Sequence, residues 1–256
     1  MSKTQIACLG ALIAAASAFG QQAPAQPAPA QPEFKLNLAE NFGYYAFDGG
    51  SNLAAFDTSL KLDLSDAFTV GVAVPVYNQG DNTNIGDVSV WGEAVAMESK
   101  GNLLGVFHDW SLSVFGGVDL PTETVFASNN VNPFFGAQFN SGIFGVEGLQ
   151  FGQSVEYTFV GTDAYVPLLG AFTSSDVLNF GTDLSYWFSK ELALTADFVQ
   201  QYYVDSSEYQ LLLGPGAKWN VTHSINLNAS VLMPISQSVN TSESDYVVTA
   251  GVGIEF

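Results

Sequence analysis

The sequence predicts an all-β fold, a closed barrel of antiparallel strands that crosses a membrane. Three observations lead to this prediction. The last twelve residues alternate between apolar side chains and side chains that are polar or small. Segments with the same alternation recur along the chain from Glu33 onward. Charged residues make up only 12% of the sequence, about half of the usual share in a soluble domain.

The C-terminal segment 245–256 carries the clearest pattern. A strand turns successive side chains to opposite faces, and here only Val247 breaks the alternation. The apolar face holds Tyr246, Val248, Ala250, Val252, Ile254 and Phe256. A strand of this kind that ends on an aromatic residue resembles the closing strand of bacterial outer-membrane barrels. That resemblance implies that outer-membrane lipid surrounds the barrel and that the barrel assembly machinery recognises Phe256.

The N-terminal region predicts export. Lys3 precedes an apolar stretch, residues 6–19, which is too short to span a bilayer and is followed by small residues typical of a cleavage site. We therefore predict a signal peptide over residues 1–20, a Pro/Ala/Gln-rich periplasmic leader over residues 21–32, and a barrel over residues 33–256. Cys8 is the only cysteine and lies in the signal peptide, so the mature chain has no thiol chemistry.

The alternation predicts twelve strands, each of the length that a tilted membrane strand requires. In chain order they cover residues 34–47, 51–65, 68–78, 85–98, 108–120, 132–140, 147–161, 176–189, 191–205, 208–220, 224–238 and 244–256. The pattern is clear in most of them. The segment 132–140 is the least regular, because Pro133 and Asn140 crowd it, and a barrel of ten strands is therefore the alternative.

The connections between these strands alternate in character. Those after even-numbered strands are compact, as at 64–68, 188–192 and 219–225. Those after odd-numbered strands are mostly longer and rich in Asn, Asp, Gly, Ser and Thr, as at 121–132 and 161–175. An even-stranded barrel keeps both termini in the periplasm, so the longer connections are predicted to be extracellular. Aromatic residues near the strand ends predict a belt at each membrane interface.

Charged side chains of the strands fall almost entirely on the inward face. Glu40 is the one outward charge, and we interpret it as the mark of a β-bulge. Inward charges require an interior that is wet or internally paired. The predicted pore-lining charges are Asp57, Lys61, Asp63, Glu156, Asp183, Asp197 and Lys218. Acids outnumber lysines among them, which predicts a mild preference for cations.

Two functions fit this arrangement. Many inward positions are glycine, including Gly71, Gly117 and Gly181, and small residues that leave volume unfilled favour a narrow channel for small solutes. Alternatively, the inward lysines pair with neighbouring acids and stiffen a closed structural barrel, whose loops at 121–132 and 161–175 contact partners. The sequence leaves the solute and the oligomeric state open.

Short segments also resemble one particular group of barrels. Residues 72–77 (VAVPVY), 85–90 (IGDVSV) and 213–219 (LGPGAKW) are similar to motifs of the outer-membrane proteins grouped with the meta-pathway of phenol degradation. Ile85 stands where that pattern often has glycine. The resemblance implies passage of small aromatic or hydrophobic molecules, and it assigns no functional residue.

Other function classes find little support in the sequence. The two histidines, His108 and His223, both fall on the predicted periplasmic side, without the Ser and Asp arrangement that a barrel hydrolase requires. We therefore predict that the protein is not an enzyme. No spacing of Cys and His suits a metal site, and no cofactor is predicted. The net charge of −19 argues against nucleic acid as a partner.

Overall fold

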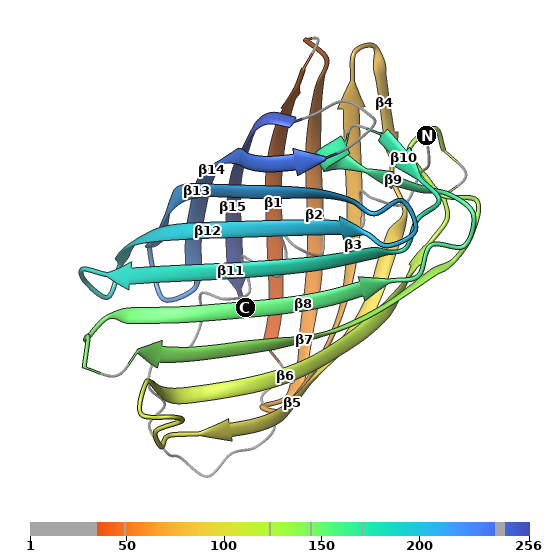
Figure 1. The fold of residues 1–256 in the computed structure, drawn as a ribbon. Helices are drawn as coiled ribbons and strands as arrows, with labels where there is room; N and C mark the ends of the chain where they lie inside the picture. The colour runs from red at the N-terminus through yellow and green to blue at the C-terminus, as the bar shows by residue number, and fades with distance from the viewer. Residues whose placement is uncertain (1–34, 49, 123, 144, 170, 239–243) are drawn as a thin grey trace.

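The computed structural model describes residues 35–48, 50–122, 124–143, 145–169, 171–238 and 244–256. The predicted signal peptide and leader lie outside these residues. Within the described ranges, twelve long strands form a closed antiparallel barrel (Figure 1). The barrel strands are β1 (Lys35–Phe47), β2 (Asn52–Ser65), β3 (Phe68–Gln79), β5 (Val88–Ser99), β6 (Phe107–Leu120), β7 (Asn132–Ile143), β8 (Leu149–Thr158), β11 (Val177–Trp187), β12 (Leu192–Tyr203), β13 (Glu208–Asn220), β14 (Ile225–Ser238) and β15 (Ser244–Glu255).

Four short elements lie outside this set. β4 (Asn82–Ile85) extends the hairpin of β3, and β9 (Ala164–Val166), the 3-10 turn η1 (Pro167–Leu169) and β10 (Ala171–Thr173) form a separate hairpin. The predicted count of twelve barrel strands is confirmed. The alternative of ten is wrong, because β7 pairs along its length with both β6 and β8. In the described part of the chain, no helix has the length and apolar character needed to span a bilayer.

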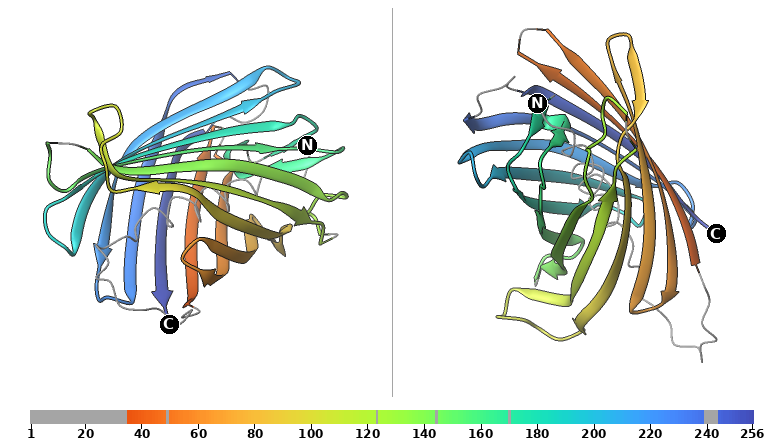
Figure 2. Two further views of the ribbon diagram at one scale, coloured as in Figure 1. Left: turned by 90° about the horizontal axis from the view of Figure 1, so that it is seen from below. Right: turned by 90° about the vertical axis from the view of Figure 1, so that its right-hand side faces the viewer.

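The barrel closes between its first and last strands. β1 pairs with β2 on one side and with β15 on the other, so the order of strands around the wall returns to its start. Two further contacts fasten this seam. Lys35 Nζ lies 3.0 Å from Glu255 Oε1, and the Phe256 N–H donates to the Leu36 carbonyl at 2.8 Å. The views in Figure 2 show the wall curving round on itself.

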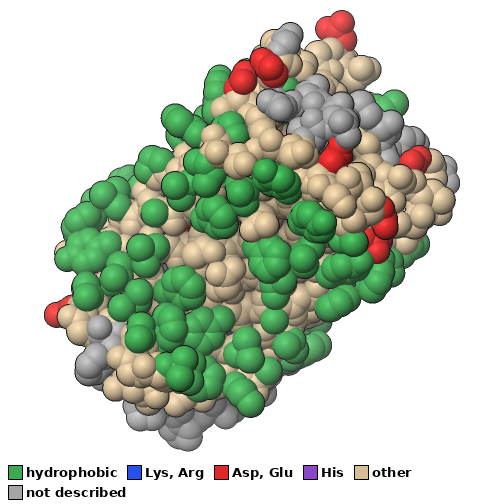
Figure 3. Space-filling view, in the orientation of Figure 1, with side chains coloured by type: hydrophobic (Ala, Val, Ile, Leu, Met, Phe, Trp, Pro, Cys, Tyr) green, Lys and Arg blue, Asp and Glu red, His purple; other side chains and the backbone are tan. Residues whose placement is uncertain are grey.

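Side chains along each strand alternate between the interior and the outer surface. On β2, Asp57 is 3% exposed and Ser59 1%, whereas Phe56 is 50% exposed and Leu60 40%. Apolar side chains cover the middle of the outer wall, and the acidic side chains in view lie toward its ends (Figure 3). On β2 between Phe56 and Leu60, the predicted arrangement, apolar outside and polar inside, is therefore confirmed. It is the arrangement that a bilayer requires of a barrel.

The two ends of the barrel differ. We call the end that holds the start of β1 and the end of β15 the terminal end, and the opposite one the loop end. Connections at the terminal end are short, as at 66–67 and 188–191, with 100–106 as the longest. Those at the loop end include the two longest segments between barrel strands, 121–131 and 159–176. The difference follows the predicted trend.

Two local predictions need correction. The strand predicted over 85–98 is broken between β4 and β5, because Gly86 turns its N–H to the Pro75 carbonyl at 2.8 Å and Asp87 turns inward. The β-bulge predicted at Glu40 is absent. Glu40 keeps a regular register with both neighbouring strands, and the Thr58 hydroxyl on the same outer face donates to its carboxylate at 2.9 Å. That hydrogen bond offsets part of the cost of an outward charge.

Candidate functional site in the barrel interior

The structure places all seven predicted charges on strands of the barrel, in separate groups rather than in one ring. Three lie on β2, one lies on β8, and three come together across β11, β12 and β13. The last group is the most closely connected. Asp183 and Asp197 occupy directly opposed positions of β11 and β12, and Lys218 reaches them from β13. We call these three residues the charge cluster.

Lys218 is held within the charge cluster by short contacts. Its Nζ lies 2.9 Å from Asp183 Oδ1 and donates to Ser185 Oγ at 3.1 Å. The Ser185 hydroxyl donates in turn to Asp183 at 2.6 Å. Asp197 accepts a hydrogen bond from the Thr195 hydroxyl at 3.2 Å. The side chains of Asp183 and Lys218 are only 11% and 13% exposed, so this ion pair is largely screened from water.

The charges on β2 have quite different surroundings. Asp57 is buried, and in the described part of the chain neither of its carboxylate oxygens has a hydrogen-bond partner. Lys61 places its ammonium group over the Trp91 ring, 5.1 Å from the centroid, a cation–π arrangement. Asp63 accepts hydrogen bonds from Asn37 at 3.1 Å and from Thr69 at 2.7 Å.

Glu156 on β8 is also buried, and it accepts a hydrogen bond from the Asn179 amide at 3.1 Å. Its strand, β8, carries none of the other six predicted charges. The structure brings together Asp183, Asp197 and Lys218. Their spacing in the sequence alone could not show this. The structure keeps the β2 charges apart from them.

The loop end of the interior is filled by a segment that the sequence placed on the surface. Residues 159–169 and 171–176, which we call the inner loop, fold into the barrel as the β9–η1–β10 hairpin (Figures 1 and 2). The Tyr165 ring packs among aromatic rings, with centroids 5.3 Å from Phe126, 6.2 Å from Tyr77 and 5.0 Å from Phe172. The Leu168 carbonyl accepts hydrogen bonds from the Gln210 amide at 3.3 Å and from the Ser244 hydroxyl.

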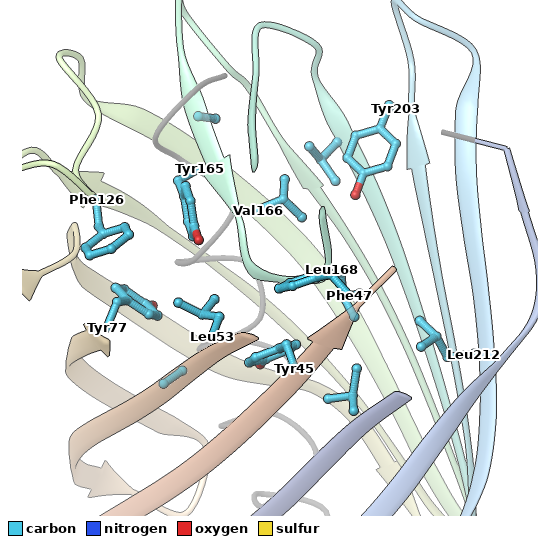
Figure 4. Packing of buried hydrophobic residues seen from close by; sticks show 14 of the residues in the cluster. Tyr45, Phe47, Leu53, Tyr77, Phe126, Tyr165, Val166, Leu168, Tyr203 and Leu212 are labelled. Atoms are coloured by element: carbon cyan, nitrogen blue, oxygen red, sulfur yellow. The ribbon is translucent and has the colours of Figure 1, made fainter. Parts of the chain in front are cut away.

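Inward apolar side chains of the wall surround the inner loop. They include Tyr45, Phe47, Leu53, Val177, Tyr203 and Leu212, all buried (Figure 4). The interior at this end is therefore an apolar core, and the polar lumen is confined to the rest of the barrel. The apolar run Ala164–Leu168 inside a polar connection is the sequence signal that could have indicated this arrangement.

The second predicted surface loop is also folded inward. Phe126, Ala127 and Ser128 are buried, and the Ser128 N–H donates to both carboxylate oxygens of Asp87, at 2.8 and 3.0 Å. The prediction that 121–132 and 161–175 present contact surfaces is therefore wrong for these buried residues. Their apolar side chains are used inside the barrel.

Several inward glycines do not leave the volume that the sequence suggested. A methyl group on Gly71 would lie 2.4 Å from the Trp91 ring, one on Gly117 would lie 2.7 Å from the Phe134 ring, and one on Gly136 would lie 2.4 Å from the Phe115 ring. Large inward aromatics on neighbouring strands therefore occupy that space. The inference from small residues to an open lumen was wrong at Gly71 and Gly117.

A cavity of about 80 Å³ remains inside the barrel, beneath the inner loop. Its roof, toward the loop end, includes Leu168, Leu232 and Val247, and its floor includes Asp183, Asp197 and Lys218. The cavity is thus apolar on one side and charged on the other. Among the described residues, no group of three or more His, Cys, Asp or Glu side chains is arranged to hold a metal ion.

Comparison with known proteins supports the architecture. No family model matches the sequence, and no curated protein matches it. Among solved structures, an outer membrane channel from Pseudomonas putida F1 is similar over 92% of this chain and 100% of its own, with a TM-score of 0.64 at 12% identity. The fold is that of an outer-membrane β-barrel.

Two porins share the same fold. The NanC porin covers 85% of this chain and 98% of its own length, with a TM-score of 0.55 at 13% identity. The KdgM porin, solved in complex with disordered oligogalacturonate, covers 85% of this chain and 99% of its own, with a TM-score of 0.50 at 12% identity. At these identities the likeness concerns the fold. The narrower resemblance to the phenol-degradation group stays a prediction.

Proposed function

We propose that the protein is an outer-membrane channel that passes small solutes passively and prefers cations. The observation that carries this proposal is the excess of carboxylates on the inner wall. Five of the seven predicted lumen charges are acids, and one of the two lysines is engaged with Asp183. A lumen with excess carboxylate attracts cations and disfavours anions.

Shared architecture supports the channel part of the proposal. The solved barrels described above are named as a channel and as porins. The same proposal includes an outer-membrane location and assembly through the terminal Phe256. It also includes small aromatic or hydrophobic compounds among the solutes. The inner loop fills the loop end, so we infer that solute passage requires this loop to move.

Planar-bilayer recording tests the proposal. In a salt gradient, the wild-type protein should give stepwise openings with a reversal potential on the cation-selective side. Asp183→Asn and Asp197→Asn should each move that potential toward zero, because each removes a carboxylate from the lumen. Asp66→Asn is the matched control, since Asp66 is exposed in the turn between β2 and β3. Equal potentials in all four proteins would contradict the assignment of selectivity to the lumen.

The alternative is a closed structural barrel without conductance. The apolar core formed by the inner loop favours it, because that core occupies the loop end. Loosening the core with Tyr165→Ala distinguishes the two functions. A channel held shut by the inner loop should conduct more in this variant, whereas a closed barrel should stay silent while remaining folded. Folded protein is recognised by its faster migration on unheated gels.

A further inference from the structure

The cavity beneath the inner loop has two chemically different sides. Leu168, Leu232 and Val247 supply aliphatic surface, and the charge cluster supplies carboxylates to the same cavity. Leu232 and Val247 are opposed residues of β14 and β15, whereas Leu168 belongs to the inner loop. The roof is therefore partly wall and partly loop.

When Asp183 and Asp197 are both ionised, the charge cluster carries two negative charges and one positive charge. Asp183 and Asp197 occupy opposed positions and interact electrostatically, and carboxylates this close repel each other when both are ionised. Among the described residues, Lys218 is the one cationic side chain that lines the cavity, and its ammonium group is already engaged with Asp183 and Ser185. A second cation would compensate Asp197. An added carboxylate would increase the repulsion.

The volume and the roof define the rest of the ligand. About 80 Å³ is several times the roughly 10–15 Å³ that a single water needs, so a short organic chain fits. A bare metal ion would leave the aliphatic roof unused, and among the described residues no metal-binding group was found. A hydrocarbon chain that carries one ammonium group matches both sides of the cavity.

We propose that this cavity binds small primary ammonium compounds, with the ammonium group at Asp197 and the hydrocarbon chain against Leu168, Leu232 and Val247. The inference rests on the proposed function, because the ligand is one of the solutes that pass through the channel. Since Leu168 is part of the inner loop, the bound chain touches the segment that fills the loop end. The site therefore selects amines over acids of equal size.

Equilibrium binding to the full chain, folded in detergent micelles, tests this proposal without any need for conductance. The probes are n-butylammonium, 1-butanol and butyrate, which share a chain and differ in charge; saturation-transfer NMR and calorimetry measure binding. Butylammonium should bind at least tenfold more tightly than either of the other two, because a charge-assisted hydrogen bond is lost with each of them. Equal binding of butanol or butyrate would overturn the proposal.

Variants locate the site. Asp197→Asn should weaken butylammonium binding at least tenfold, and Asp197→Glu should retain part of the binding. Leu168→Ser should also weaken binding, because it removes aliphatic contact between the inner loop and the hydrocarbon chain. Asp66→Asn should leave it unchanged. Wild-type affinity in Asp197→Asn would place the ligand elsewhere and overturn the inference. Conductance without butylammonium binding would refute this site alone, whereas binding by a protein that stays silent in bilayers would refute the channel.

Discussion

Replacing Lys218 with methionine isolates the contribution of the buried ion pair. Methionine keeps most of the side-chain volume and removes the charge, which leaves Asp183 and Asp197 facing each other without a cation. At the observed 2.9 Å between Lys218 Nζ and Asp183 Oδ1, the attraction is about 6 kcal/mol at an effective dielectric constant near 20. Desolvation cancels part of this energy, and breaking a buried pair costs about 3–5 kcal/mol. We expect a loss of stability in that range.

Asp183→Asn should cost less than Lys218→Met, because Lys218 then still has Asp197 nearby. The double variant Lys218→Met/Asp183→Asn should recover most of the stability, since one carboxyl group then remains without a like-charged neighbour. Denaturant unfolding in micelles, followed by tryptophan fluorescence and by migration of unheated samples, gives the free energy of unfolding for each protein. The reasoning is refuted if Lys218→Met unfolds like the wild type, or if the double variant is no more stable than Lys218→Met.

Three further predictions concern the interior and the final residue. Gly136→Ala should lower the free energy of unfolding by about 1–3 kcal/mol, because the new methyl group would lie 2.3 Å from the Val155 carbonyl oxygen. The control is Gly92→Ala, where the nearest atom would lie 3.7 Å from the new methyl group. It should be near neutral in the same denaturant unfolding measurement. Tyr165→Ala removes a buried ring and should cost about 3–5 kcal/mol of local stability, seen as faster proteolysis of the inner loop; unchanged cleavage would contradict the packing. Phe256→Ala should reduce the amount of folded barrel in outer membranes, with normal refolding in detergent; normal membrane levels would remove Phe256 as a recognition element.

The sequence predicted the wall well because its signal is local. Side chains on a strand face inward and outward in alternation. The sequence alone therefore assigns Asp57 and Phe56 to opposite faces of the wall. Strand number and the two kinds of connection followed from the same repeat and from turn residues. The β-bulge predicted at Glu40 is absent because an outward acid can keep its register when Thr58 donates to it.

The interior was less predictable because it depends on register between strands. The sequence suggests empty space at Gly71, but the Trp91 ring lies over it. The pairing of β3 with β5 sets that contact. The charge cluster likewise needs β11, β12 and β13 in one alignment. The sequence placed the inner loop on the surface because a polar connection with one apolar run can lie outside or pack inside a barrel. Packing inside depends on Tyr77 and Phe126, which are distant in the sequence.

The seam between β1 and β15 has a consequence for biogenesis. It joins residues from opposite ends of the described chain, so the loop-closure entropy is largest for this pairing, and contacts of such high sequence separation slow folding. Until the seam forms, both strands present unpaired backbone edges, which are templates for aggregation. A chaperone that shields β1 and β15 separately would thus protect the nascent protein more than one that binds the hairpins between them.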